Sequence, residues 1–120
     1  MTTAADLYRY QATVTRWVDG DTAKVDVDLG CHVHWRGSLR CAGYNAPEVR
    51  GDTKQAGLLA TAEVERLCPV GSTVYLDSLA FEHDDEEDDF GRMLAEVTLP
   101  DGRDLAELMI AGGYAVVDEP

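Results

Sequence analysis

The stretch YRYQATVTRWVDGDTAKVDVDL, residues 8–29, carries the clearest indication of the fold. Apolar side chains alternate with polar ones in two runs, the first made of Tyr8, Tyr10, Ala12 and Val14 and the second of Ala23, Val25, Val27 and Leu29. Alternation with a period of two predicts half-buried β-strands. The segment 18–22, centred on Gly20, lies between the runs and predicts a tight turn. We therefore expect an antiparallel pair of strands here.

The segments on the C-terminal side of this pair predict a mixture of strands and helices. A third strand is expected over residues 32–42, followed by two more over residues 73–81 and 91–99. Pro100, Asp101 and Gly102 then predict a turn. Asp104 and Glu107 are expected to cap a short last helix that ends at residues 112–113, where two glycines follow each other.

A longer helix is expected between the third and fourth strands. Asp52 is a suitable N-cap, and Gln55 lies three residues later, in the position of a reciprocal capping partner. Apolar residues then recur at helical spacing, namely Ala56, Leu59, Ala60, Val64 and Leu67. The helix should stop at residues 68–71, which include Pro69 and Gly71.

The order of these elements predicts a single α+β domain, mainly β, that spans residues 1–120. Three strands, a helix, two strands and a short helix are typical of a five-stranded barrel of the OB type. A chain of 120 residues is long enough to bury a core of its own without disulfides or a structural metal.

Composition and charge limit the possible functions. The formal net charge is −13, which repels nucleic acid at long range. The cysteines, Cys31, Cys41 and Cys68, lack metal-ligand spacing and are expected to be reduced and mostly buried. No apolar run approaches the length of a membrane span, and the first residues do not resemble a signal peptide. We therefore expect a cytoplasmic protein that does not bind membranes.

Polar residues near two predicted turns are the first candidates for chemistry. Asp21 starts the second strand on the side of the inward-facing valines, so its carboxylate should point into the mouth of the barrel. Arg40, Asn45 and Glu48 flank the sharp turn at Pro47 and should lie near one another. Each also has a simpler interpretation, as a turn residue bonded to its own backbone or as a solvated surface residue.

Four separated motifs, in order, resemble the staphylococcal nuclease family over residues 10–117. The first is Asp-Gly-Asp-Thr at residues 19–22, and the second runs from Arg40 to the Pro-Glu pair that ends at Glu48. The third is the aromatic-Gly-Arg triplet at residues 90–92, and the fourth is the segment 101–108 with Gly113 and Ala115. The resemblance implies an OB-fold barrel and a Ca²⁺-dependent phosphodiesterase that acts on DNA and RNA.

The resemblance also implies roles for individual residues. Glu48 would be the general base that activates water, while Arg40 and Arg92 would bind the phosphate oxygens and stabilise the transition state. Calcium would be held by the Asp21 carboxylate, the Asn45 amide oxygen and the Ala46 carbonyl. The expected substrate is single-stranded DNA or RNA.

The chain departs from the family pattern at several positions. Asn45 replaces an aspartate ligand, so the site should hold Ca²⁺ weakly or prefer another divalent ion. Asp89 and Phe90 stand where the family has a lysine and a tyrosine, and the C-terminal helix of the family is not expected here. These changes predict looser binding of the substrate.

The acidic run HDDEEDD, residues 83–89, directly precedes the triplet that carries Arg92. It is interpreted either as a solvated hairpin tip, as a docking patch for a basic protein partner over residues 84–89, or as a gate to the site. Two functions other than a nuclease are therefore also considered. The chain could be a non-catalytic OB module that binds a protein partner through its acidic surface, or a nucleic-acid mimic that blocks a basic protein.

Overall fold

The computed structural model describes residues 8–84 and 88–118, without the side chains of residues 82–84 and 88–90. Five strands close into a barrel in the order β1-β2-β3-β6-β5. They are β1 (Arg9–Asp19), β2 (Thr22–Asp28), β3 (His34–Cys41), β5 (Thr73–Asp84) and β6 (Asp88–Thr98). The predicted mostly-β barrel with two helices is thereby confirmed.

The barrel is closed by one parallel and four antiparallel strand pairs. The first three strands form the predicted meander, with Val14 opposite Val25 and Val25 opposite Gly37. β6 runs parallel to β3 and antiparallel to β5, and β5 pairs with β1 to complete the ring. Closure places the end of β3 beside β6, so that Ser38 lies opposite Arg92.

The predicted alternation in the first two strands is confirmed over most of its length. Ala12 and Val14 in β1, and Ala23, Val25 and Val27 in β2, are all buried. Tyr8 and Leu29 were expected on the same faces but are exposed, because β1 begins at Arg9 and β2 ends at Asp28. A register shift between Val14 and Arg16 turns Trp17 inward, and its indole Nε1 donates to the Cys68 carbonyl at 2.9 Å.

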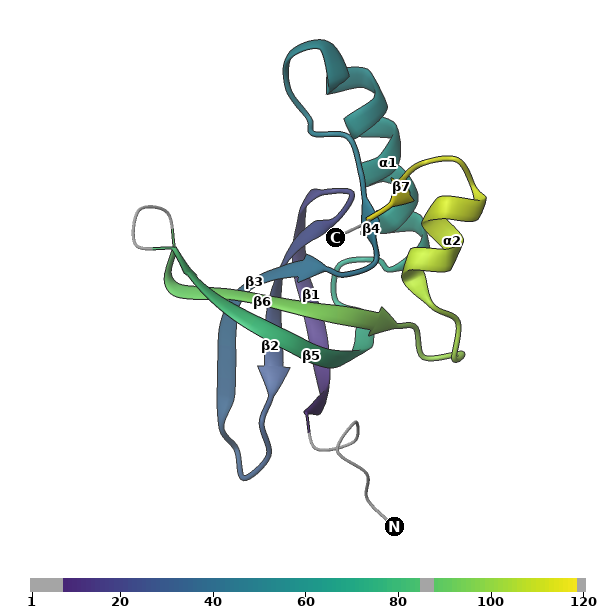
Figure 1. Ribbon diagram of the computed structural model, residues 1–120. Helices are drawn as coiled ribbons and strands as arrows, with labels where there is room; N and C mark the ends of the chain where they lie inside the picture. Colours follow the sequence, from purple (N-terminus) through teal and green to yellow (C-terminus); the bar gives the residue numbers. More distant parts are fainter. Residues whose placement is uncertain (1–7, 85–87, 119–120) are drawn as a thin grey trace.

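The remaining elements gather at one end of the barrel (Figure 1). They are β4 (Tyr44–Asn45), a 3₁₀ turn η2 (Gly51–Thr53), α1 (Lys54–Leu67), α2 (Leu105–Ala111) and β7 (Val116–Val117). β4 and β7 form an antiparallel pair that the sequence did not predict. The capping of α2 by Asp104 is confirmed, since its carboxylate accepts from the Ala106 N–H at 3.1 Å.

The predicted start and inner face of α1 are partly wrong. The N-cap is Thr53 rather than Asp52, and the Thr53 hydroxyl donates to the carbonyls of Glu48 and Arg50 at 2.8 and 3.0 Å. Ala60 and Val64 are buried as expected, but Ala56 and Leu59 are exposed and Gly57 is buried in their place. The helix lies so close to the preceding segment that a Cβ at residue 57 would sit 2.5 Å from the Glu48 carbonyl oxygen.

Two of the three cysteines are buried, and all three are free thiols. Cys41 and Cys68 lie in the core, while Cys31 is exposed in the loop between β2 and β3. Burial raises the pKa of the Cys41 thiol to about 12. No helix in the described part of the chain is both long and apolar enough to cross a membrane.

Candidate functional site

A cleft of about 360 Å³ opens beside the end of β3, and every site residue predicted from the sequence lines it. Asp21, Arg40, Asn45, Ala46, Glu48 and Arg92 are all present, and the cleft is completed by Val18, Asp19, Thr22 and Arg50. The residues come from the β1–β2 hairpin, from β3, from β4 with its connection to α1, and from β6. Only the folded barrel brings these four segments together.

The β1–β2 turn is fixed by partners from distant parts of the chain. The buried Tyr44 hydroxyl donates to the Gly20 carbonyl at 2.8 Å, and the Cys41 N–H donates to the Asp21 carbonyl at 2.8 Å. A Cβ on Gly20 would lie 2.8 Å from the Ala46 Cβ, so this turn needs a glycine for a close approach. Burial raises the pKa of the Tyr44 phenol, so the hydroxyl stays neutral and continues to donate.

The Asp21 carboxylate is almost fully buried and bonds to three other residues. Its Oδ2 accepts from the Ala46 N–H at 2.9 Å and lies 3.2 Å from Nη1 of Arg40. Its Oδ1 accepts from the Thr22 hydroxyl at 3.0 Å. Asp21 is therefore not a turn residue bonded only to its own backbone, and it ties the β1–β2 turn to β3 and to the β4–α1 connection.

The Arg40 guanidinium is surrounded by oxygen atoms. Besides contacting Asp21, Nη1 donates to the carbonyls of Cys41 and Tyr44 at 2.8 and 3.1 Å. Nη2 donates to Oδ1 of Asn45. Because its side chain is only 15% exposed and held at several points, Arg40 presents a positive charge in a fixed place.

Glu48 lies at the rim of the cleft and is paired with Arg50. The Arg50 Nε lies 2.7 Å from Oε2 of Glu48, and both side chains are more than half exposed. The hydrogen bond and the positive charge of Arg50 lower the pKa of Glu48, which keeps the carboxylate ionised at neutral pH. The backbone after it is held as well, since the Val49 N–H donates to Oδ1 of Asp19 at 3.3 Å.

Arg92 differs from Arg40 in having an unsatisfied donor. Its Nε is buried and has no hydrogen-bond partner among the described residues. A buried donor without a partner is unfavourable, so this N–H stands out among the polar groups of the residues that line the cleft. Asp89 and Phe90, which precede it in the predicted triplet, have no described side chains, and residues 85–87 of the acidic run lie outside the described residues.

Two of the side-chain oxygens predicted to hold calcium contact Arg40 in this structure. Asp21 Oδ2 lies 3.2 Å from Nη1, and Asn45 Oδ1 accepts from Nη2, so both oxygens lie on the same side of the cleft as the guanidinium. Within the described ranges, no cluster of three or more His, Cys, Asp and Glu side chains is arranged to hold a metal ion. One carboxylate, one amide and one carbonyl leave most of a calcium shell to water.

Three residues that shape the cleft were not among the predicted site residues. Asp19 was noticed only as part of the turn motif, yet its carboxylate bonds to the segment that carries Glu48. Arg50 was not among the predicted residues, although an arginine two residues after the candidate base Glu48 could have indicated an ion pair with it. Asp118 could not be found from the sequence, because it reaches Asn45 only through the β4–β7 pair.

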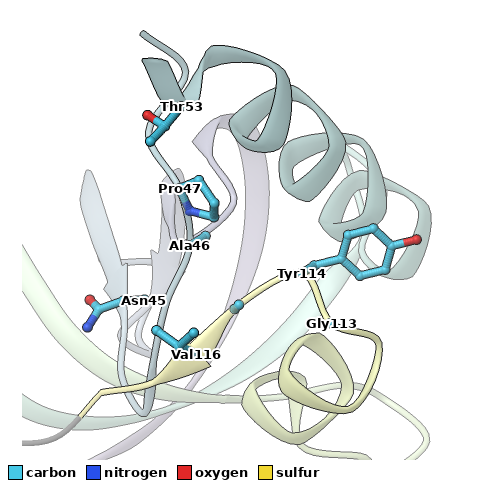
Figure 2. Close-up of a pocket in the computed structure, with 8 residues that line it drawn as sticks. Asn45, Ala46, Pro47, Thr53, Gly113, Tyr114 and Val116 are labelled. Atoms are coloured by element: carbon cyan, nitrogen blue, oxygen red, sulfur yellow. The ribbon is translucent and has the colours of Figure 1, made fainter. Parts of the chain in front are cut away.

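A second hollow, also of about 360 Å³, shares Asn45 and Ala46 with the cleft. Its other lining residues are Pro47, Thr53, Gly113, Tyr114, Ala115 and Val116. Figure 2 shows it between the segment that runs from Asn45 to Thr53 and the segment that follows α2. Neither segment contributes a charged side chain to this hollow.

Comparison with known proteins does not identify a family. No protein-family model matches the chain, and a search of curated proteins finds no significant relative. Sequence motifs and the geometry of the cleft are therefore the basis for the functional conclusion.

Proposed function

We propose that the protein is a divalent-cation-dependent nuclease of the staphylococcal nuclease type, built on an OB-fold barrel. The observation that carries this proposal is the meeting of six residues, from three of the four separated motifs, in one cleft. A chance resemblance between short motifs would not require them to be neighbours in space. The cleft is also the right kind of site for a phosphodiester, since it combines fixed positive charge with an exposed carboxylate.

Arg40 and Arg92 would bind the phosphate in complementary ways. Arg40 is held in place by surrounding oxygens and contributes a fixed field, which needs no reorganisation as charge develops on the phosphorus oxygens. Arg92 lines the cleft, so its positive charge would attract a phosphate, and a small movement of its side chain would let the unpaired Nε–H donate to a phosphate oxygen. Arg92 would also donate a hydrogen bond to the leaving oxygen.

Glu48 would act as the general base. Its carboxylate is ionised and exposed at the rim of the cleft, where a water molecule can lie between it and a bound phosphate. As the water oxygen forms its bond to phosphorus, the water proton passes to Glu48 and the bond from phosphorus to the leaving oxygen breaks. Arg50 lowers the basicity of Glu48, so the pair must loosen for efficient proton transfer.

Asp21, Asn45 and the Ala46 carbonyl would hold the cation, with Ca²⁺ as the first candidate. When bound, a divalent cation supplies a Lewis acid that neutralises phosphate charge. Asp21 and Asn45 now contact Arg40, so these side chains would share their oxygens between the guanidinium and the cation. The chain has a strongly negative net charge, and a cation in the cleft would lower the local cost of bringing in a phosphate.

The experiment is cleavage of single-stranded DNA and of RNA with Ca²⁺, with other divalent ions and with a chelator. The wild-type protein should cleave only when a divalent cation is present, and Glu48→Gln should lose about 10²–10⁴-fold in rate while it stays folded. Glu63→Gln is a matched control, since Glu63 is also paired with an exposed arginine but lies on α1. Absence of cleavage in every ion would overturn the proposal.

A second candidate function is a non-catalytic module that binds a protein partner, and one observation favours it. All three side chains expected to bind the cation or act as the base are already paired with arginines, Asp21 and Asn45 with Arg40 and Glu48 with Arg50. Side chains that only stabilise the fold would be paired with arginines in the same way. The cleavage experiment above separates the two functions.

A further inference from the structure

The Asn45 side chain is held at both ends of its amide. Its Oδ1 accepts from Nη2 of Arg40, and its Nδ2 donates to Oδ1 of Asp118 at 3.0 Å. The opposite orientation would turn the NH₂ group toward the guanidinium and the oxygen toward the carboxylate, so both contacts would become repulsive. One arginine and one aspartate therefore fix which way this amide points.

Asp118 is brought to Asn45 by the backbone. β4 and β7 pair antiparallel, with Tyr44 opposite Val117 and Asn45 opposite Val116. The next residue continues this pairing, since the Asp118 N–H donates to the Gly43 carbonyl at 3.2 Å. The Asp118 carboxylate therefore lies beside Asn45, although the two residues are 73 positions apart in the sequence.

The charge of Asp118 influences which side chain is favourable at position 45. Asn45 is neutral, so the one negative charge of the Asn45–Asp118 pair lies on Asp118. A carboxylate at position 45 would lie against the Asp118 carboxylate, and two like charges in contact repel. Asp118 therefore makes an amide the favourable side chain at position 45.

We propose that Asp118 is a positioning residue of the cleft, which holds the Asn45 amide oxygen toward Arg40 and the cation and supplies the negative charge that position 45 lacks. This inference rests on the proposed function in so far as it concerns the cation. The orientation of the amide is independent of that function and is tested separately.

The first arm of the test uses the side-chain amide resonances of Asn45 in NMR spectra. In wild type, the two Nδ2 protons should differ in chemical shift by more than those of a free amide, because only one of them is bonded to a carboxylate. Asp118→Ala should collapse this difference toward that of a free amide, and the exposed control Glu65→Gln on α1 should not. Unchanged resonances in Asp118→Ala would overturn the proposal.

The second arm measures Ca²⁺ affinity by calorimetry in Asn45→Asp, Asp118→Asn and the double variant. Asp118→Asn removes the negative charge beside the amide, so it should bind Ca²⁺ about fivefold less tightly than the wild-type protein, the size expected for loss of one exposed charge near a cation. The double variant places that charge at position 45 instead, so it should recover the affinity that Asp118→Asn loses. Equal affinities of these two variants would contradict the proposal. If no variant binds Ca²⁺ while the NMR difference still depends on Asp118, the cation proposal fails and the orienting role of Asp118 stands.

Discussion

Two hollows of the same volume share Asn45 and Ala46, yet they are lined by opposite kinds of side chain. The cleft collects residues from the β1–β2 turn, β3 and β6, and six of its ten lining residues are charged: Asp19, Asp21, Arg40, Glu48, Arg50 and Arg92. The second hollow collects residues that follow α2 and has no charged lining residue. Asn45 and Ala46 line both hollows, so the same stretch of chain borders both environments. Size alone would not separate these hollows, and the chemistry of their lining does.

Among substitutions in the two hollows, one at Arg92 should have the largest effect on the rate of cleavage. Arg92→Gln removes the unsatisfied Nε–H and the positive charge, and the rate of cleavage should fall about 10²–10³-fold, as for loss of one transition-state donor. Val116→Thr, in the second hollow, should leave the rate unchanged. Cleavage kinetics and thermal unfolding of both variants check this. Equal losses of cleavage rate in the two variants would show that cleavage does not depend on the charged lining of the cleft.

A second contrast concerns how closely the cleft is packed against α1. Gly57→Ala adds a Cβ that meets the Glu48 carbonyl and the Val49 nitrogen, at 2.5 and 2.8 Å. Although alanine is the better helix residue by about 1 kcal/mol, overpacking should lower the free energy of unfolding by about 2 kcal/mol. Cleavage should also slow, because Glu48 is displaced.

Ala56→Gly is the control, since it alters helix propensity at the exposed neighbouring residue. It should cost about 1 kcal/mol in urea unfolding and leave the rate unchanged. A Gly57→Ala variant that is more stable than wild type would show that the helix is not in close contact with the Glu48 segment.

The acidic run should slow the capture of substrate by the charged cleft. Replacing Asp84, Asp85, Glu86 and Glu87 by Asn and Gln should raise kcat/KM about fivefold at low salt and much less at high salt, because salt screens exposed charges. This prediction rests on the sequence alone. Glu65, Glu96 and Glu107, all exposed and outside the run, form a control when changed to Gln. An equal gain in the control would assign the effect to net charge rather than to the run.

The smallest expected effect is a shift in pH dependence caused by Arg50. Arg50 lowers the pKa of Glu48, so the base is lost only when the pH falls below that lowered pKa. Arg50→Gln should raise the pKa of Glu48 toward its ordinary value, and the acidic limb of the kcat/KM profile should move to higher pH.

Arg66→Gln is the control, because Arg66 is an exposed arginine that pairs with a partly buried glutamate, Glu63, whose pKa is also lowered. It should leave the acidic limb in place. A limb that stays in place in Arg50→Gln as well would exclude Glu48 as the general base.

Much of the barrel could be predicted from the sequence because its strands obey a local rule. β1 and β2 each have one buried and one exposed face, so apolar and polar residues alternate along them. This alternation correctly identified Val14, Val25 and Val27 as buried residues. The rule was not applied beyond Val14 in the first strand, and it does not hold at Trp17, where a register shift changes which side chains face inward. Nothing in the local pattern indicates that shift.

The candidate site was predictable where its residues lie in short motifs, and not where contacts are long-range. Arg40 and Asn45 are five residues apart, and the turn between them brings them together. Asp118 meets Asn45 through a two-residue strand pair that is too short to leave a pattern. The start of α1 was misplaced because Thr53 bonds to carbonyls of the preceding segment, which competes with the usual capping signal at Asp52.

The central claim is that the residues of the cleft act together on one phosphate. It is tested most directly by cation-dependent cleavage rates of Glu48→Gln, Arg92→Gln and the double variant, measured in single-turnover conditions. Residues that act as a unit give strongly non-additive losses, so the double variant should be little slower than the worse of the two single variants. Losses that simply multiply, or single variants that cleave as fast as wild type, would contradict the account.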